Sequence, residues 1–172
     1  MIRNLIIVLA GIFFSVQGFA EPSPFPTSQS SFSPKINIDS LIDRNPVYSG
    51  DSFRLYLSVQ IEEGWHIYSL HPLDGNERLA TRIILEENIF ESAERWQESP
   101  VSLIQDDAQD KMVKGHTITA EFHKNFNVPQ NSKPGKHFLT GKLLYQACDN
   151  NLCTLPQSLP FTRQIQVGII KE

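Results

Sequence analysis

The chain has 172 residues, of which 40% are hydrophobic, and its 15 basic and 19 acidic residues give a formal net charge of −4. This length suffices for one domain with a substantial core, and the lack of a Lys/Arg cluster argues against nucleic acid as a partner. The sequence has no G-x-S-x-G, P-loop or G-x-G-x-x-G motif, so it gives no support to a hydrolase or a nucleotide-binding protein.

Residues 1–20 have the features of a secretion signal peptide. Arg3 is their only charged residue, an apolar run follows at 5–14, and the small residues Gly18 and Ala20 precede a predicted cleavage site. The apolar run is shorter than the roughly 20 residues of a membrane-spanning helix, which disfavours the alternative of an uncleaved anchor. We therefore predict export to the periplasm, with no membrane-spanning segment in the mature chain.

Residues 21–35 follow as a leader rich in proline and serine. The segment 21–34 (EPSPFPTSQSSFSP) contains four prolines and five serines. Such a stretch buries too little apolar area to offset the entropy lost on ordering, so we predict that it is flexible. The folded domain is then expected over residues 36–170.

The domain is dominated by alternating apolar and polar residues, the pattern of half-buried strands. The clearest case runs from Phe53 to Ile61, between two turns that contain glycine. Further strands are predicted at 65–69, at 81–85, at 118–122 (Ile118, Ala120 and Phe122), at 138–148 and at 159–169. Short strands separated by Gly, Pro and Asn turns predict an all-β fold, specifically an antiparallel immunoglobulin-like β-sandwich. Trp65 and Trp96 are interpreted as core residues.

Two stretches break the strand pattern. Residues 71–78 (HPLDGNER) are predicted to form a polar loop, and residues 99–115 a long loop that contains Asp106, Asp107 and Asp110. A loop of that length in a small domain is more often functional or mobile than incidental. We interpret the three aspartates as solvated loop residues, with a role in tuning the cysteines as the alternative.

Cys148 and Cys153 are the only cysteines of the chain and are separated by four residues. Residues that face each other on antiparallel neighbours lie close enough at Cα for a disulfide. Closing so short a loop stabilises the fold by only about 2 kcal/mol, so the bond is weak as reinforcement. From spacing alone the pair is either a structural clip or a thiol–disulfide exchange centre.

A metal site is the third interpretation of the pair. Two thiols lack the third and fourth ligands that zinc needs, and the five histidines show no His-x-x-x-His or similar spacing. A copper(I) site with two thiolate ligands is conceivable but disfavoured. We therefore predict no metal and no cofactor.

The cysteine segment, residues 145–156 (YQACDNNLCTLP), resembles the active-site segment of the N-terminal periplasmic domain of DsbD-type thiol:disulfide interchange proteins. Residues 61–69 (IEEGWHIYS) resemble a strand of the same domain that continues from an acidic-Gly turn into an aromatic-rich stretch. Both segments occur in the family's order and at about its spacing, so the resemblance covers most of residues 36–170.

This resemblance implies an immunoglobulin-like sandwich that relays electrons through a reversible Cys148–Cys153 disulfide. A membrane-embedded or thioredoxin-like donor would reduce the pair, and oxidised periplasmic proteins would accept the electrons. Cys153 would attack the partner disulfide and Cys148 would resolve the mixed disulfide, so the resemblance implies a thiol:disulfide oxidoreductase of the protein-disulfide reductase type. DsbD-type proteins continue into a transmembrane and a thioredoxin-like domain, so the donor is expected to act in trans.

The resemblance also implies a cap loop over the cysteines, here the stretch 99–110. That stretch lacks the family's aromatic residue, so Leu103 or Ile104 is the expected shield. The alternative to an exchange protein is a secreted β-sandwich binding or chaperone module whose hairpin disulfide is structural.

The surroundings of the pair predict a sluggish thiol. Asp149 is expected to raise the thiol pKa, because a neighbouring negative charge opposes ionisation. No Lys or Arg lies within five residues of the pair to activate a thiolate. Tyr68 and His66 are interpreted as ordinary strand residues half in the core. The alternative, stronger for Tyr68 than for His66, is that they pack near the pair from an adjacent strand and shield or tune it.

Overall fold

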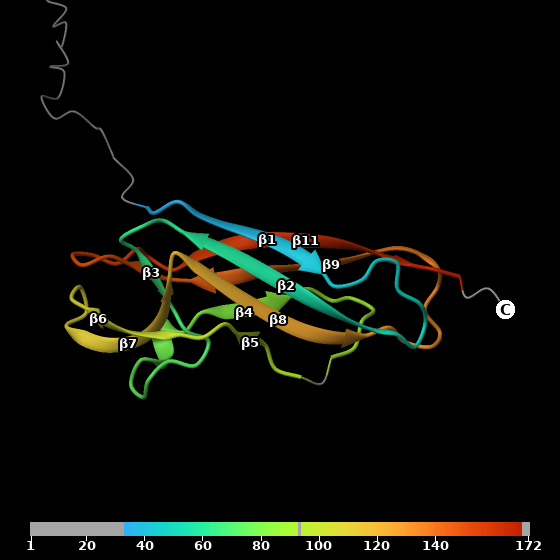
Figure 1. Ribbon diagram of the computed structural model, residues 1–172, viewed down its shortest axis with the longest axis horizontal. Helices are drawn as coiled ribbons and strands as arrows, with labels where there is room; N and C mark the ends of the chain where they lie inside the picture. The colour runs from blue at the N-terminus through green and yellow to red at the C-terminus, as the bar shows by residue number, and fades with distance from the viewer. Residues whose placement is uncertain (1–32, 93, 170–172) are drawn as a thin grey trace, which may run out of the picture. The chain divides into compact units, whose positions relative to one another are not determined.

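The computed structural model describes residues 33–92 and 94–169, which form three antiparallel sheets (Figure 1). The first has the strand order β1 (Ile36–Ile42), β2 (Ser52–Ile61), β8 (Thr119–Asn127), β5 (Gln97–Glu98). The second has the order β11 (Gln157–Val167), β9 (Gly135–Tyr145), β4 (Arg82–Leu85). The third has the order β10 (Ala147–Cys148), β3 (His66–Tyr68), β7 (Lys111–Thr117), β6 (Ser102–Asp106).

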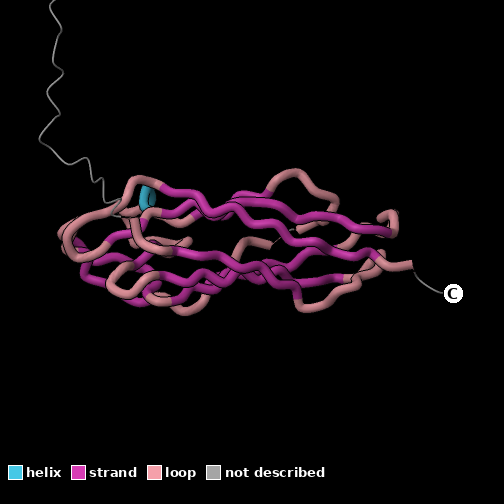
Figure 2. The backbone as a smooth tube through the Cα atoms, turned by 90° about the horizontal axis from the view of Figure 1, so that it is seen from above, coloured by secondary structure: helices cyan, strands magenta, loops and turns pink. Residues whose placement is uncertain are grey.

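The first and second sheets form the two layers of a sandwich, which Figure 2 shows one above the other. The alternating apolar residues of β2 are all buried, as the sequence pattern predicts. They pack in one core with buried residues of the facing strands β9 and β11, namely Leu139, Leu143, Phe161, Ile165 and Val167. The predicted fold class, an all-β immunoglobulin-like sandwich, is confirmed.

The third sheet lies at one end of the sandwich (Figure 1), and its strand β10 contains Cys148. Its strand β3 continues the chain from β2 after a turn at Gly64, whose φ of 84° lies in the left-handed region that glycine adopts readily. Trp65 and Trp96 are partly buried against the main core, as expected.

The structure corrects the predicted long loop at 99–115. This stretch is a hairpin of β6 and β7, in which Ser102 pairs with Gly115 and Asp106 with Lys111. Neither strand shows a clear alternation of apolar and polar residues, since β6 reads SLIQD and β7 reads KMVKGHT, so the period of two that marks β2 is missing here. Of residues 71–78, the last two begin a short 3-10 helix, η1 (Glu77–Leu79).

Two predicted strand ends are also wrong. Ile118 lies between β7 and β8 with a φ of 64° and is 65% exposed, so it is not part of the core face of β8. Ile169 lies beyond β11 and is 72% exposed. The strands β1 and β5 were not predicted from the sequence. β1 pairs along one edge of β2, and β5 has only two residues, too few for a periodicity to show.

The predicted signal peptide, residues 1–20, and nearly all of the predicted leader, 21–35, fall outside the described residues. Only the last three residues of that leader are described, and they have no regular secondary structure. Among the residues that the structure describes, none belongs to a helix that is long and apolar enough to span a bilayer.

Glu98 at the end of β5 connects the sandwich to the third sheet. Its carboxylate accepts hydrogen bonds from Ser69 Oγ at 2.5 Å and from the backbone N–H of Leu70 at 2.9 Å, and it lies 2.9 Å from His116 Nε2. Burial by itself raises the pKa of Glu98, but the hydrogen bonds outweigh this effect and the pKa is lowered. The carboxylate therefore stabilises the position of β3 and β7 in its ionised form.

Replacement of Glu98 by Gln is expected to lower the free energy of unfolding at neutral pH by about 1–3 kcal/mol, because one of the two acceptor oxygens becomes an NH₂ donor and the partners of that oxygen lose their acceptor. The pKa of Glu98 is lowered in the folded state, so its contribution is complete above the unfolded value near 4.5. It is lost as the pH falls through the folded value. Urea denaturation of wild type and Glu98→Gln, near neutral pH and well below the folded pKa, measures both effects.

Glu121→Gln is the matched control, since Glu121 is exposed on β8 of the same sheet. It should leave the unfolding free energy within a few tenths of a kcal/mol of wild type. Equal stability of Glu98→Gln and Glu121→Gln at neutral pH would contradict the assigned role of Glu98.

Candidate redox site

Strand pairing at the end of the sandwich builds the site. The two-residue strand β10 pairs with β3 so that Cys148 lies opposite His66, and Ala147 opposite Ile67. On its other side Cys148 forms an isolated antiparallel bridge with Cys153, and the two sulfurs are joined in a disulfide. The predicted proximity of the cysteines is therefore confirmed.

The two sulfurs differ in their access to solvent. Cys148 is fully buried, and it forms a small apolar cluster with Tyr68 and Val113. Cys153 is only partly buried and packs at the edge of that cluster. An attacking thiolate from outside would thus meet the sulfur of Cys153 first.

Tyr68 is the side chain in closest polar contact with the disulfide. It is fully buried, and its hydroxyl oxygen lies 2.8 Å from Cys148 Sγ and 3.8 Å from Cys153 Sγ. A disulfide sulfur has no proton, so the hydroxyl donates its own to Asp106 Oδ2, at 2.6 Å. Burial, and then the hydrogen bond and negative charge of Asp106, raise the pKa of Tyr68 far above its ordinary value. Tyr68 therefore keeps its proton and remains a hydrogen-bond donor.

Asp106 corrects the expectation of three solvated aspartates. Asp107 and Asp110 are exposed, but Asp106 is fully buried at the end of β6. Its Oδ2 accepts the bond from Tyr68, and its Oδ1 accepts a 3.0 Å bond from the backbone N–H of Gln109. Side chains two positions apart on a strand point to the same face, so Asp106 shares the inward face of Ile104. The sequence indicates this only once residues 102–106 are recognised as a strand.

Gln109, which the sequence did not single out, lies in the turn between β6 and β7. Its side-chain amide donates a 3.3 Å hydrogen bond to Cys153 Sγ. The turn therefore contacts the more accessible sulfur through a polar side chain. Of the two predicted shielding residues, Ile104 packs against the small cluster around Cys148, whereas Leu103 is 65% exposed and lies outside that cluster.

His66 is brought beside Cys148 by the β3–β10 register and is buried. Its Nε2 lies 3.4 Å from Asp106 Oδ2, within ion-pair distance, yet the geometry gives this nitrogen no hydrogen bond. Burial lowers the pKa of His66, and the nearby charges of Asp106 and Asp149 only partly oppose this shift. The imidazole is therefore held mainly neutral.

The loop that joins the cysteines is held by hydrogen bonds that do not involve sulfur. Asp149 Oδ1 accepts bonds from the backbone N–H groups of Asn151 and Leu152, both at 2.7 Å. Beyond the disulfide, the Thr154 N–H donates to the Ala147 carbonyl at 2.8 Å, and the Ala147 N–H donates to Thr154 Oγ1 at 3.2 Å. The loop conformation therefore does not depend on the disulfide alone.

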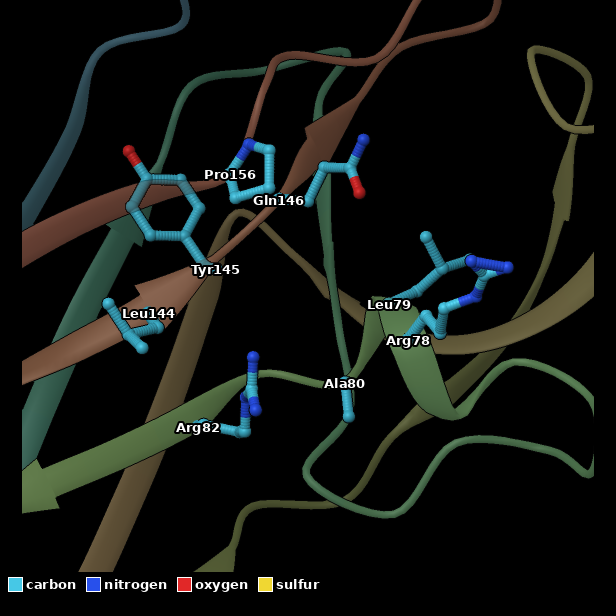
Figure 3. Close-up of a pocket in the computed structure, with 8 residues that line it drawn as sticks. All are labelled: Arg78, Leu79, Ala80, Arg82, Leu144, Tyr145, Gln146 and Pro156. Carbon is cyan, nitrogen blue, oxygen red and sulfur yellow. The ribbon is translucent and has the colours of Figure 1, made fainter.

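A pocket lies beside the cysteine segment. Figure 3 shows Tyr145, Gln146 and Pro156 on one side of it, and on the other the segment 78–82 with its two arginines. Leu79 of this wall also packs against the cluster of Cys148. The cavity volume is about 50 Å³, which is room for a few water molecules. This pocket is too small for a nucleotide or a flavin.

The fold resembles that of a known periplasmic domain. The N-terminal periplasmic domain of ScsB from Proteus mirabilis superposes with a TM-score of 0.51 at 19% identity, over 73% of this chain and 45% of that chain. A family 123 glycoside hydrolase from Clostridium perfringens gives a TM-score of 0.35 at 10% identity, over 79% of this chain and 28% of that one, and carries no argument. No curated protein matches the sequence.

The family model described as the N-terminal domain of thiol:disulfide interchange protein DsbD matches residues 39–164, well over half of the chain. The matched range contains both cysteines together with Tyr68 and Asp106. The resemblance identified from residues 145–156 and 61–69 is thus confirmed. The chain belongs to the family of DsbD N-terminal domains.

Proposed function

We propose that the protein is a periplasmic thiol–disulfide exchange protein that relays electrons through Cys148 and Cys153. One observation carries this proposal. The disulfide has one sulfur buried beside a Tyr68–Asp106 pair and the other partly exposed, in a loop that its own hydrogen bonds maintain. Such a bond can be opened and closed without rebuilding the fold.

In the forward reaction the thiolate of Cys153 attacks one sulfur of a client disulfide. A bond forms between Cys153 and the client, and the client's other sulfur leaves as a thiolate and takes up a proton. Cys148 then attacks Cys153 Sγ, the Cys148–Cys153 bond forms, and the client's remaining sulfur leaves as a thiol. The client gains two electrons and two protons, and the protein is left as the disulfide.

The return reaction needs a dithiol donor, which we propose to be a membrane-embedded or thioredoxin-like protein. A donor thiolate attacks the more accessible Cys153 Sγ, and Cys148 leaves as a thiolate. The donor's second thiol then displaces Cys153 and closes the donor disulfide. Membership of the DsbD N-terminal family supports this direction of electron flow, and together with the fold likeness to a periplasmic domain it supports a periplasmic location.

Tyr68 is placed to assist the step in which Cys148 leaves. Its hydroxyl lies 2.8 Å from Cys148 Sγ and keeps its proton because its pKa is raised. As negative charge develops on the sulfur, the hydroxyl proton can turn from Asp106 Oδ2 toward it. A donor placed in advance at a buried developing charge lowers the barrier more than water would.

The turn between β6 and β7 provides the cap over the pair. Gln109 contacts Cys153 Sγ, and Asp106 fixes the turn through the Gln109 backbone N–H. A partner that displaces Gln109 exposes the sulfur, which would limit exchange with unrelated thiols in an oxidising compartment.

Reduction of the disulfide is expected to lower the free energy of unfolding by no more than about 2 kcal/mol, because the closed loop is short and its hydrogen bonds remain. The couple should equilibrate with glutathione at a potential above about −300 mV, the range of inert secreted bridges. Urea denaturation with and without a reductant, together with a glutathione titration, measures both quantities. Unfolding on reduction, with a potential below that range, would instead support a binding or chaperone module with a structural clip.

Substitution of either cysteine is expected to separate the two sulfur roles. Cys153→Ser should abolish exchange with a disulfide substrate, because the accessible nucleophile is lost. Cys148→Ser should accumulate a mixed disulfide, because Cys153 still attacks but nothing resolves the product. Non-reducing electrophoresis and mass spectrometry detect the adduct. Adduct formation by Cys153→Ser and not by Cys148→Ser would reverse the assignment.

Tyr68→Phe is expected to slow reduction of the disulfide by a small dithiol by about tenfold or more, since the donor to the leaving Cys148 thiolate is removed. The rate is measured by stopped-flow fluorescence or by quenching with a thiol-blocking reagent. Tyr48→Phe is the control, because Tyr48 is 39% exposed and lies outside the site. Equal rates for wild type and Tyr68→Phe, with the fold intact, would show that Tyr68 packs against the disulfide but does not assist its reduction.

A further inference from the structure

The ring nitrogen Nε2 of His66 is a buried polar atom without a hydrogen bond. Leaving such a group unsatisfied costs about 1–3 kcal/mol, so its surroundings call for an explanation. The nitrogen lies 3.4 Å from Asp106 Oδ2. Ligand atoms of His66, Asp106 and Cys148 all lie within 4.8 Å of one another, and all three residues are buried.

Reduction of the disulfide changes the chemistry of this cluster. The bonded sulfurs become two thiols that can each donate electrons to a metal ion, and Cys153 adds a fourth ligand to the cluster. One imidazole nitrogen, one carboxylate oxygen and two thiolate sulfurs are donors that Zn²⁺ accepts in a tetrahedral site. The sequence showed only the two sulfurs, because the nitrogen and oxygen donors come from β3 and β6, far from them in the chain.

We propose that the reduced protein binds one Zn²⁺ through Cys148, Cys153, His66 and Asp106, and that the oxidised protein does not. In a tetrahedral zinc site with bonds of about 2.0–2.3 Å, neighbouring ligand atoms lie roughly 3.3–3.8 Å apart. The spacing of 3.4 Å between His66 and Asp106 already meets this requirement. Reduction breaks the bond between the two sulfurs, which leaves each of them free to take up its own ligand position.

The surroundings of the cluster suit a metal ligand set. Tyr68 donates a hydrogen bond to Asp106 Oδ2 and orients the carboxylate, as neighbours of metal ligands commonly do. Two thiolates and a carboxylate carry three negative charges in a buried place, and Zn²⁺ offsets two of them. Each donor atom therefore gains a partner that the reduced, metal-free site lacks.

Zinc binding and disulfide exchange would compete for the same sulfurs. A client disulfide that oxidises the zinc form takes two electrons from the zinc-bound thiolates and two protons from the solvent, and it becomes two thiols. The Cys148–Cys153 bond forms and Zn²⁺ is released to the solvent, so charge and atoms balance. This inference rests on the reducibility of the disulfide that the proposed function requires, and it adds a metal-bound resting state to the exchange cycle.

The test uses the mature chain, reduced with a phosphine and freed of reductant under anaerobic conditions. Zn²⁺ is titrated in competition with a chromophoric chelator, and Co²⁺ is used as a spectroscopic probe of the same site. We expect one equivalent of Zn²⁺ on the reduced protein and none on the oxidised protein. Bound Co²⁺ should show the visible bands of tetrahedral coordination and a sulfur-to-cobalt charge-transfer band. Absence of zinc binding by the reduced wild type overturns the inference.

Substitutions separate this site from a simple dithiol chelate. His66→Ala and the bulkier His66→Gln should each weaken Zn²⁺ binding at least tenfold and change the Co²⁺ spectrum. His71→Ala, which alters an exposed histidine, should leave both unchanged. Unchanged affinity in a folded His66 variant means that the sulfurs alone hold the metal, and this outcome also overturns the inference.

The same samples are assayed for exchange with a small disulfide in the presence of a metal chelator. Wild-type protein that exchanges normally but binds no Zn²⁺ refutes the metal site and leaves the proposed function in place. Failure of the reduced, metal-free protein to exchange in the chelator, together with Zn²⁺ binding when the chelator is omitted, would refute the proposed function and leave the metal site standing.

Discussion

The buried carboxylate of Asp106 is the group on which the geometry of the site depends. One of its oxygens holds the hydroxyl of Tyr68 beside Cys148, and the other holds the backbone of Gln109 in the turn above Cys153. Asp106 thus positions the side chain beside the buried sulfur of Cys148 and also the turn that covers the more accessible sulfur of Cys153. A change in the turn that moves this carboxylate also moves the donor at the buried sulfur, so access to the site and its chemistry are coupled.

The main hydrophobic core and the disulfide lie in different parts of the domain. Among the described residues, the large core between the two layers of the sandwich contains no sulfur, whereas Cys148 belongs to a separate small cluster with Tyr68 and Val113. The loop around the disulfide is also held by hydrogen bonds of Asp149 and Thr154. In the proposed exchange cycle, this separation would let the disulfide open without disturbing the main core.

The sequence predicted those features of the fold and the site that depend on residues close together in the chain. The period of two along β2 reveals the sandwich, and the cysteine segment by itself indicates a disulfide and its family. It placed Asp106 among three solvated aspartates, with a role in tuning the cysteines only as the alternative, because three acidic residues within five positions look like a solvated loop and hide the inward face of β6. Gln109 was missed for a related reason, since its contact with Cys153 depends on a turn whose shape Asp106 sets. Such contacts arise from strand register, which no local spacing encodes.

Reduction of the disulfide brings negative charges close together in a buried place. In the disulfide both sulfurs are neutral, and among the described residues Asp106 is the only acidic side chain that contacts Tyr68. Reduction adds two groups that are reactive only as thiolates, in a buried place where an existing carboxylate opposes further negative charge. The hydroxyl of Tyr68 can relieve one developing charge, but it has a single proton to offer. A bound cation relieves both, and renewed disulfide formation removes both, so these are alternative ways of satisfying the same buried sulfurs.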